Sequence, residues 1–209
     1  MLTVDGLSYE RSKRILFKQL TFQLCQGQTL HIVGANGSGK TTLLEILTGL
    51  RIPLTGKVMW NGLSIKKNSI NFTENLLYVN HRLGMKSTLN LIENLYLCLT
   101  RRNLIRHQSK RKAIHDIHQI LDQLNLRHCT KTLLKQLSIG QQRRLSLAKL
   151  LLIKANCWIL DEPFTSLDKQ GITLLSSLME KQSARGGVIV FTSHSSVYSL
   201  HSEIKKIFL

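Results

Sequence analysis

The stretch Thr29-Leu30-His31-Ile32-Val33-Gly34-Ala35-Asn36-Gly37-Ser38-Gly39-Lys40-Thr41 decides the fold of this 209-residue chain. From Gly34 to Thr41 it matches the phosphate-binding pattern G-x-x-x-x-G-K-[ST] in full. The apolar run of residues 29–33 predicts a strand before the pattern, and residues 41–50 predict a helix after it. This strand–loop–helix context is the one in which the pattern binds phosphate, so we expect a nucleotide-binding α/β core.

The chemistry of this loop follows from its residue types. Glycines let the backbone curl so that several N–H groups point at one phosphate, and the following helix start adds a partial positive charge. We expect Lys40 to reach the β- and γ-phosphates of ATP and the Thr41 hydroxyl to ligate Mg²⁺. The loop residues predicted to bind ATP are Gly34, Ala35, Asn36, Gly37, Ser38, Gly39, Lys40, Thr41 and Thr42.

Two carboxylates follow another apolar run far downstream. Residues 157–160 predict a buried strand, and Asp161 and Glu162 come directly after it. The carboxyl ends of strands in an α/β sheet face the ligand crevice. We therefore predict that Asp161 holds Mg²⁺, mostly through water, and that Glu162 orients or deprotonates the attacking water.

A third motif lies between these two. Leu137-Ser138-Ile139-Gly140-Gln141 begins a predicted helix, and the spacing of Ser138 and Gln141 predicts a capping box. The stretch resembles the LSGGQ signature of ABC ATPases, and the chain is identified as a member of that family. In ABC ATPases this helix start reaches the nucleotide of the partner subunit. The resemblance therefore implies a homodimer in which Ser138, Gly140 and Gln141 contact ATP across the interface.

The other motifs of the family appear in the expected order. Ser166-Leu167-Asp168 resembles the D-loop, which links the two ATP sites of a dimer. Thr192-Ser193-His194 resembles the switch-histidine motif, which implies that His194 hydrogen-bonds the γ-phosphate. Tyr9 stands where the family has an aromatic residue that stacks on adenine, although an ordinary edge-strand tyrosine is the alternative interpretation.

Two positions depart from the family pattern. Ile139 stands where the signature has its first glycine, so closure around the partner's phosphate is expected to be slower or reshaped. The glutamine that should follow the predicted strand at residues 76–79 is not evident, and the chain has Asn80-His81-Arg82 there. Either His81 or Arg82 takes its place, or the coupling to the membrane partner differs.

The spacing of the motifs separates two classes of ABC protein. Between Gly34 and Ser138 there is room only for a small helical insert, whereas chromosome-type members have a long coiled coil there. Translation-type members carry two such domains, and this chain has one. The energy-coupling ATPase of a membrane transporter is therefore favoured over a soluble ATPase that acts on nucleic acid or ribosomes.

Within transporters, the chain resembles the ATP-binding subunits of the bacterial haem exporter of cytochrome c maturation. The resemblance implies a homodimer on the cytoplasmic face of the inner membrane, with a permease-like integral subunit and a haem-handling membrane subunit as partners. ATP hydrolysis would drive haem delivery or export, and the ATPase of another small export system is the alternative. The similar stretches are residues 75–81, 84–86, 93–95, 140–144 and 158–165.

The composition agrees with a globular protein that has an anionic partner. Apolar residues make up 43% and charged residues 20%, which excludes disordered and collagen-like chains. The formal net charge is +17. The cations of residues 101–135 form either a solvated face or a contact with anionic lipid, and nucleic acid is not expected. They are Arg101, Arg102, Arg106, Lys110, Arg111, Lys112, Arg127, Lys131 and Lys135.

Other cofactors and a membrane span are not expected. The four cysteines are widely spaced, so we predict neither a disulfide framework nor a zinc site. None of the eight histidines forms a convincing axial-ligand pair, so the chain itself is not expected to bind haem. No stretch approaches 18 uncharged apolar residues, the length that a membrane-spanning helix needs.

These patterns together predict an α/β P-loop NTPase of the ABC ATPase type, forming a single nucleotide-binding domain over residues 1–209. The resemblance implies an antiparallel β subdomain (about residues 1–30 and 54–80), a helical subdomain (about 82–145) and a RecA-like core for the remainder. Among local features, we expect a turn at Asp5-Gly6, a hairpin at Asn61-Gly62, helical structure over residues 88–135 and a last strand at residues 187–192.

Overall fold

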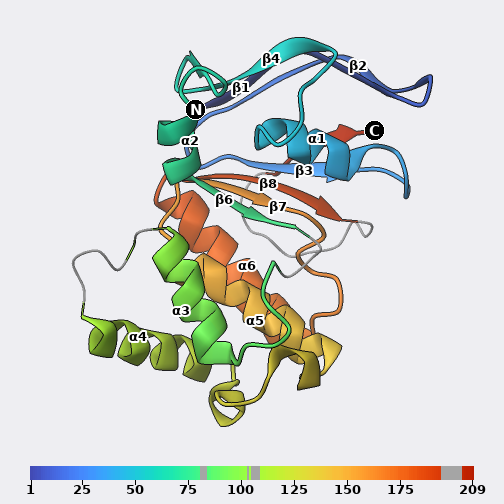
Figure 1. Ribbon diagram of the computed structural model, residues 1–209. Helices are drawn as coiled ribbons and strands as arrows, with labels where there is room; N and C mark the ends of the chain where they lie inside the picture. Colours follow the sequence, from blue (N-terminus) through green and yellow to red (C-terminus); the bar gives the residue numbers. More distant parts are fainter. Residues whose placement is uncertain (81–83, 103, 105–108, 194–203) are drawn as a thin grey trace. The chain divides into compact units, whose positions relative to one another are not determined.

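The computed structural model describes residues 1–80, 84–102, 104, 109–193 and 204–209 (Figure 1). The chain divides into two compact units. The sheet unit comprises Met1–His81, Ala155–Pro163 and Ser176–Leu209, and the helical unit comprises Arg82–Lys154 and Phe164–Leu175.

A parallel sheet forms the centre of the sheet unit. Its strand order is β6 (Leu76–Val79), β7 (Cys157–Leu160), β8 (Val188–Ser193), β3 (Thr29–Val33) and β9 (Ile204–Phe208). Every residue of β7 and β8 is buried, which is typical of parallel strands covered on both faces. The predicted strands at residues 29–33, 76–79 and 157–160 are confirmed.

The strand predicted at residues 187–192 is confirmed as β8, but it is not the last strand of the chain, because β9 follows it. This strand pairs with β3 in parallel, with Ile204 opposite Thr29 and Phe208 opposite Val33. Its exposed residues include Lys205 and Lys206. Charged side chains are characteristic of edge strands, and they hide the apolar pattern by which a strand is recognised.

A second, antiparallel sheet has the order β2 (Arg14–Leu24), β1 (Leu2–Arg11), β4 (Thr55–Trp60) and β5 (Leu63–Ser64). The predicted turn at Asp5-Gly6 was wrong, because β1 continues through both residues. Gly6 has φ +61°, and the β1–β2 register shifts between Val4 and Leu7, so the glycine accommodates a bulge. The hairpin at Asn61-Gly62 is confirmed by the pairing of Trp60 with Leu63.

Helix α1 (Lys40–Leu47) lies between the two sheets (Figure 1). Its residues Leu43, Leu44, Ile46 and Leu47 belong to a buried core that both sheets share. Helix α2 (Ser69–Asn75), which the sequence did not predict, places Phe72 against Trp60 with ring centroids 5.9 Å apart. Helix α1 is therefore packed through its apolar side chains into the core between the two sheets.

The helical unit contains α3 (Leu91–Arg101), α4 (Lys110–Gln123) and α5 (Ile139–Leu152), with 3₁₀ turns at Arg127–Cys129 and Leu134–Gln136. The helical structure expected over residues 88–135 is therefore present but interrupted. The last long helix, α6 (Lys169–Ala184), has residues in both units. None of the helices in the described ranges is long and apolar enough to cross a membrane.

Candidate nucleotide site

The loop between β3 and α1 requires glycine at two positions. Gly39 caps α1 with φ +107°, and a Cβ there would lie 3.1 Å from Leu16 Cβ. A Cβ on Gly34 would lie 2.5 Å from Ser38 Oγ and 2.8 Å from the Leu209 carbonyl oxygen. The backbone conformation therefore requires glycine at position 39, and close packing requires it at position 34.

The side chains of this loop are suited to binding an anion. Lys40 is buried, and its Nζ donates to the carbonyl oxygens of Gly34 (2.7 Å) and Ala35 (3.0 Å). Ser38 Oγ is buried and has no hydrogen-bond partner among the residues that the structure describes. A phosphate at this helix start would meet a positioned ammonium group and an unsatisfied hydroxyl.

Asp161 lies beside the loop although 120 residues separate it from Thr41. The Thr41 hydroxyl donates to Asp161 Oδ2 at 2.9 Å, and the Thr192 hydroxyl donates to Asp161 Oδ1 at 2.8 Å. The backbone N–H of Asp161 donates to the Val79 carbonyl oxygen at 2.8 Å. The two predicted magnesium ligands, Thr41 and Asp161, are therefore in direct contact.

Glu162 occupies an unusual backbone conformation at the end of β7. Its φ is +51°, in the left-handed region that non-glycine residues seldom adopt. Its N–H donates to Thr192 Oγ1 at 2.8 Å. Such backbone conformations often occur at functional sites, where surrounding contacts hold them.

These residues share one cavity of about 330 Å³. Hydroxyl and carboxylate oxygens are the ligands that Mg²⁺ prefers, and the ion often takes its remaining ligands from substrate phosphates and water. Thr41 and Asp161 offer a hydroxyl and a carboxylate in direct contact, so they fit this sparse type of site. The lining residues are Arg11, Leu16, Asn36, Gly37, Gly39, Lys40, Thr41, Thr42, Asp161 and Glu162.

Sequence reasoning missed Arg11 and Leu16. They lie on the two strands of one hairpin, since Arg11 is in β1 and Leu16 is in β2. Their place in the cavity depends on how this hairpin packs against Gly39, which is a tertiary contact with no local sequence signal. Thr192 was noted only as part of the motif that ends in His194.

Tyr9 is not among the residues that line this cavity. Its hydroxyl accepts a hydrogen bond from Arg51 Nη1 at 2.8 Å, and its ring stacks on Phe17 at 6.3 Å between centroids. Contact between Tyr9 and adenine stays a prediction. His194 lies outside the described residues, as do His81 and Arg82, so their expected roles also stay predictions.

The signature stretch begins α5 in the helical unit. The capping box is present, since Gln141 N donates to Ser138 Oγ at 3.2 Å and Ser138 N donates to Gln141 Oε1 at 3.0 Å. Ile139, the first helical residue, is 72% exposed. Asp168 accepts from Gly171 N and pairs with Arg144, and these contacts lower the pKa of its carboxyl group, the first more strongly.

The chain is similar to known proteins in sequence and in fold. A family model described as ABC transporter matches residues 17–165. The chain belongs to the ABC transporter ATPase family. The cytochrome c biogenesis ATP-binding export protein CcmA of Mannheimia succiniciproducens is 39% identical to this ABC ATPase, covering 95% of the chain and 89% of the relative. The protein of the same name from Escherichia coli K12 is 38% identical, covering 100% and 96%.

Solved structures support the fold of this ABC ATPase. An ATP-binding subunit of an ABC transporter matches with a TM-score of 0.80 at 24% identity, covering 93% of this chain and 79% of the other. A dimeric ATP-binding cassette bound to ADP and phosphate matches with a TM-score of 0.77 at 23% identity, covering 93% and 88%. The predicted α/β P-loop fold of the ABC ATPase type is confirmed. So are membership of the CcmA family and the prediction of an ATP-hydrolysing enzyme.

Proposed function

We propose that this ABC ATPase hydrolyses Mg-ATP to power an export step of cytochrome c biogenesis, and that haem is the group delivered or exported. The full-length similarity to proteins named for cytochrome c biogenesis and export supports the pathway. The observation that carries the chemistry is the convergence of Lys40, Thr41, Asp161 and Glu162 on one cavity.

We assign a role to each of these groups and to the other predicted site residues. The amides of residues 34–42 and the Lys40 ammonium hold the phosphates. Thr41 and Asp161 hold Mg²⁺, which when bound neutralises charge on the β- and γ-phosphates. Glu162 orients the attacking water and accepts its proton while the water oxygen bonds to the γ-phosphorus and ADP leaves. His194 positions the γ-phosphate.

The site is completed by a second copy of the chain. Ser138, Gly140 and Gln141 of that copy present a helix start to the γ-phosphate, and Tyr9 stacks on the adenine of its own subunit. Two features of α5 support this proposal. Its first N–H groups form a positive helix end, and its first residue, Ile139, is an exposed apolar group.

The partners are membrane proteins. We place this ABC ATPase on the cytoplasmic face of the bacterial inner membrane, bound to a permease-like integral subunit and a haem-handling membrane subunit. The word export in the names of the relatives supports a membrane complex. The alternative is that the chain is the ATPase of another small export system. The two functions can be distinguished by whether c-type cytochromes still receive haem when ATP hydrolysis stops.

The test replaces the chain in its source cells with a Glu162→Gln variant and measures covalently bound haem in c-type cytochromes. Loss of this haem, with b-type haem retained, is the expected result. An unchanged signal from a variant confirmed to be inactive would contradict the haem pathway and favour another export system.

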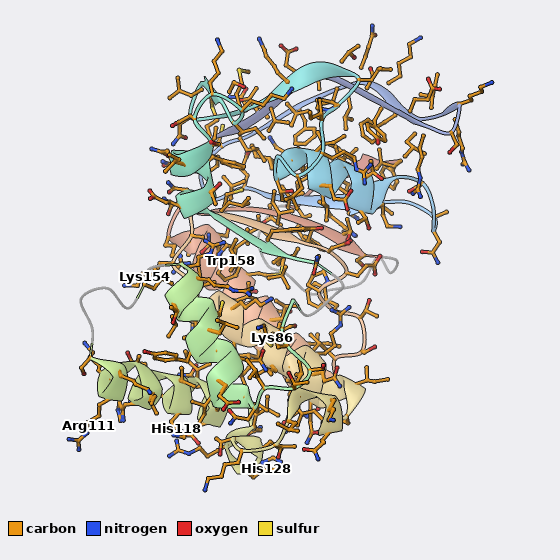
Figure 2. All side chains as sticks on the ribbon, viewed as in Figure 1. Lys86, Arg111, His118, His128, Lys154 and Trp158 are labelled. Atoms are coloured by element: carbon orange, nitrogen blue, oxygen red, sulfur yellow. The ribbon has the colours of Figure 1, made fainter. Side chains whose placement is uncertain are left out.

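We further propose that the helical unit touches anionic lipid through a surface that we call its basic end. This surface consists of four cationic residues and one leucine, namely Arg101, Leu104, Lys110, Arg111 and Lys112. All five side chains are exposed, and Figure 2 shows Arg111 at the start of α4, directed away from α3. The sequence contains no acidic residue between positions 93 and 116. Cations in the first turn of α4 oppose the helix dipole, and an anionic surface would offset that cost.

Vesicle binding tests the lipid contact. Replacement of Lys110, Arg111 and Lys112 by Gln should weaken binding to phosphatidylglycerol vesicles by on the order of ten- to a hundredfold, because each cation near an anionic membrane contributes about 1 kcal/mol. A matched variant with Lys18, Lys66 and Lys67 replaced by Gln removes three exposed cations from the sheet unit. Equal weakening by both variants would contradict a specific basic end.

A further inference from the structure

The hydroxyl of Thr192 joins the two functional carboxylate residues. Thr192 is the residue of β8 that follows the last β7–β8 pair, Leu160 with Phe191, and its side chain is fully buried. Its Oγ1 donates to Asp161 Oδ1 and accepts the Glu162 N–H, both at 2.8 Å. One oxygen atom thus makes a hydrogen bond to each of the two consecutive residues that follow the neighbouring strand β7.

The directions of these bonds follow from the groups involved. An ionised carboxylate can only accept, so the hydroxyl proton points to Asp161. The lone pairs of the same oxygen then accept from Glu162, because a backbone N–H can only donate. Serine and threonine can fill this position, since both offer a donor and an acceptor at one atom. Valine has the shape of threonine but offers neither.

The bond to Asp161 complements the bond from Thr41. Thr41 holds Oδ2 and Thr192 holds Oδ1, so hydroxyl groups fix the carboxylate at both oxygens. Thr192 is not among the residues that line the cavity. Its hydroxyl is connected to the cavity through Asp161 and Glu162, which both line it.

The bond to Glu162 supports an unfavourable backbone. A residue other than glycine at φ +51° persists only where surrounding contacts hold it. The N–H of Glu162 is held by Thr192, and the direction of the Glu162 side chain depends on this backbone conformation. A small change in this backbone conformation would move the Glu162 carboxylate away from the attacking water that it is proposed to orient.

We propose that Thr192 is a positioning residue for ATP hydrolysis. Its hydroxyl sets the direction of the Glu162 carboxylate and holds Asp161 in place for the metal. The inference rests on the proposed role of Glu162. Because Thr192 acts through other residues, its loss should lower kcat much more than it weakens ATP binding.

The experiment compares Thr192→Val with Thr192→Ser in the complex purified through this chain. We expect kcat to fall by about tenfold to a hundredfold in Thr192→Val, as for a displaced catalytic group, and to stay near the original value in Thr192→Ser. ATP affinity should change little, while the Mg²⁺ concentration for half-maximal activity should rise. Thr29→Val is the matched control, since it removes another buried hydroxyl from the same sheet at a distant strand position.

The outcomes separate the inference from the proposed function. Normal kcat in Thr192→Val, with Glu162→Gln inactive, would overturn the role of Thr192 and leave that of Glu162. Normal turnover in Glu162→Gln would overturn both. Equal loss in Thr192→Ser, or a fall in melting temperature and ATP affinity that matches the loss of kcat, would show a merely structural role. If Thr192→Val does not fold, Thr192→Ala is compared with Thr192→Ser in the same assays.

Discussion

At the residue scale, the site depends on small groups that fix larger ones. Hydroxyls from Thr41 and Thr192 hold the Asp161 carboxylate, and carbonyl oxygens of the loop hold the Lys40 ammonium. Leu16 packs against Gly39 from the hairpin. The effect of a single substitution at these positions on stability or activity can therefore be predicted from the contacts that the residue makes.

Gly39→Ala should destabilise the nucleotide-free chain by about 1–3 kcal/mol, because alanine is strained at φ +107° and its Cβ would press against Leu16. Gly37→Ala separates these causes. Gly37 also has a positive φ, +80°, but no atom lies within 4 Å of the point that an alanine methyl group would occupy, so only the backbone strain remains. Thermal melting of both variants without nucleotide measures the difference, and equal destabilisation would contradict the contact with Leu16.

A buried histidine should make stability depend on pH. His31 is 4% exposed and stacks on Phe191 with centroids 4.5 Å apart. Burial, and to a lesser degree the charge of Lys206, lower its pKa below 6.5, against an opposing backbone hydrogen bond with Ser193. Below pH 6.5 the unfolded state therefore binds more protons than the folded state, and the free energy of unfolding falls as the pH falls.

The slope from one such group reaches at most about 1.4 kcal/mol per pH unit, between pH 6.5 and the lower folded-state pKa. His31→Phe should remove this part of the slope, and chemical denaturation at a series of pH values measures it. His128→Gln, at an exposed position of the helical unit, is the control. An unaltered slope in His31→Phe would show that other groups carry the pH dependence.

At the element scale, helix starts carry both stability and function. Ser138 caps α5 and Ser109 caps α4, each accepting a hydrogen bond of 3.2 Å from the backbone three residues later. Ser138→Ala and Ser109→Ala should each cost about 0.5–2 kcal/mol of stability. Only Ser138→Ala should also lower ATP turnover, because its helix start is proposed to face the partner's nucleotide. Melting curves and phosphate release test this pair, and equal turnover would contradict the assignment.

The sequence predicted the elements whose signals are local. The strands at residues 29–33, 76–79 and 157–160 are short apolar runs with clear ends, and the capping box at Ser138 depends on spacing alone. Strand β9 was missed because its charged edge position masks the pattern. The contact of Thr41 with Asp161 could be expected from the motifs. The bridge through Thr192 could not, since it depends on the register of β7 and β8.

At the scale of the whole molecule, the two units differ in net charge. The helical unit contains sixteen of the 29 Lys and Arg residues but only four of the 12 acidic residues. The excess positive charge is therefore concentrated where the basic end lies. Charge at exposed positions acts over about 8–10 Å at physiological salt, so an interaction of this unit with an anionic surface should weaken as salt is added.

The roles of Glu162 and Lys40 are best tested by measuring ATP turnover and ATP affinity of Glu162→Gln and Lys40→Ala in the complex purified through this chain. We expect Glu162→Gln to lower turnover by at least about a hundredfold, because the carboxylate no longer accepts a proton, while ATP stays bound. We expect Lys40→Ala instead to weaken ATP binding, because the ammonium that meets the phosphates is gone. Normal turnover in Glu162→Gln would show that its carboxylate is not the group that accepts the proton.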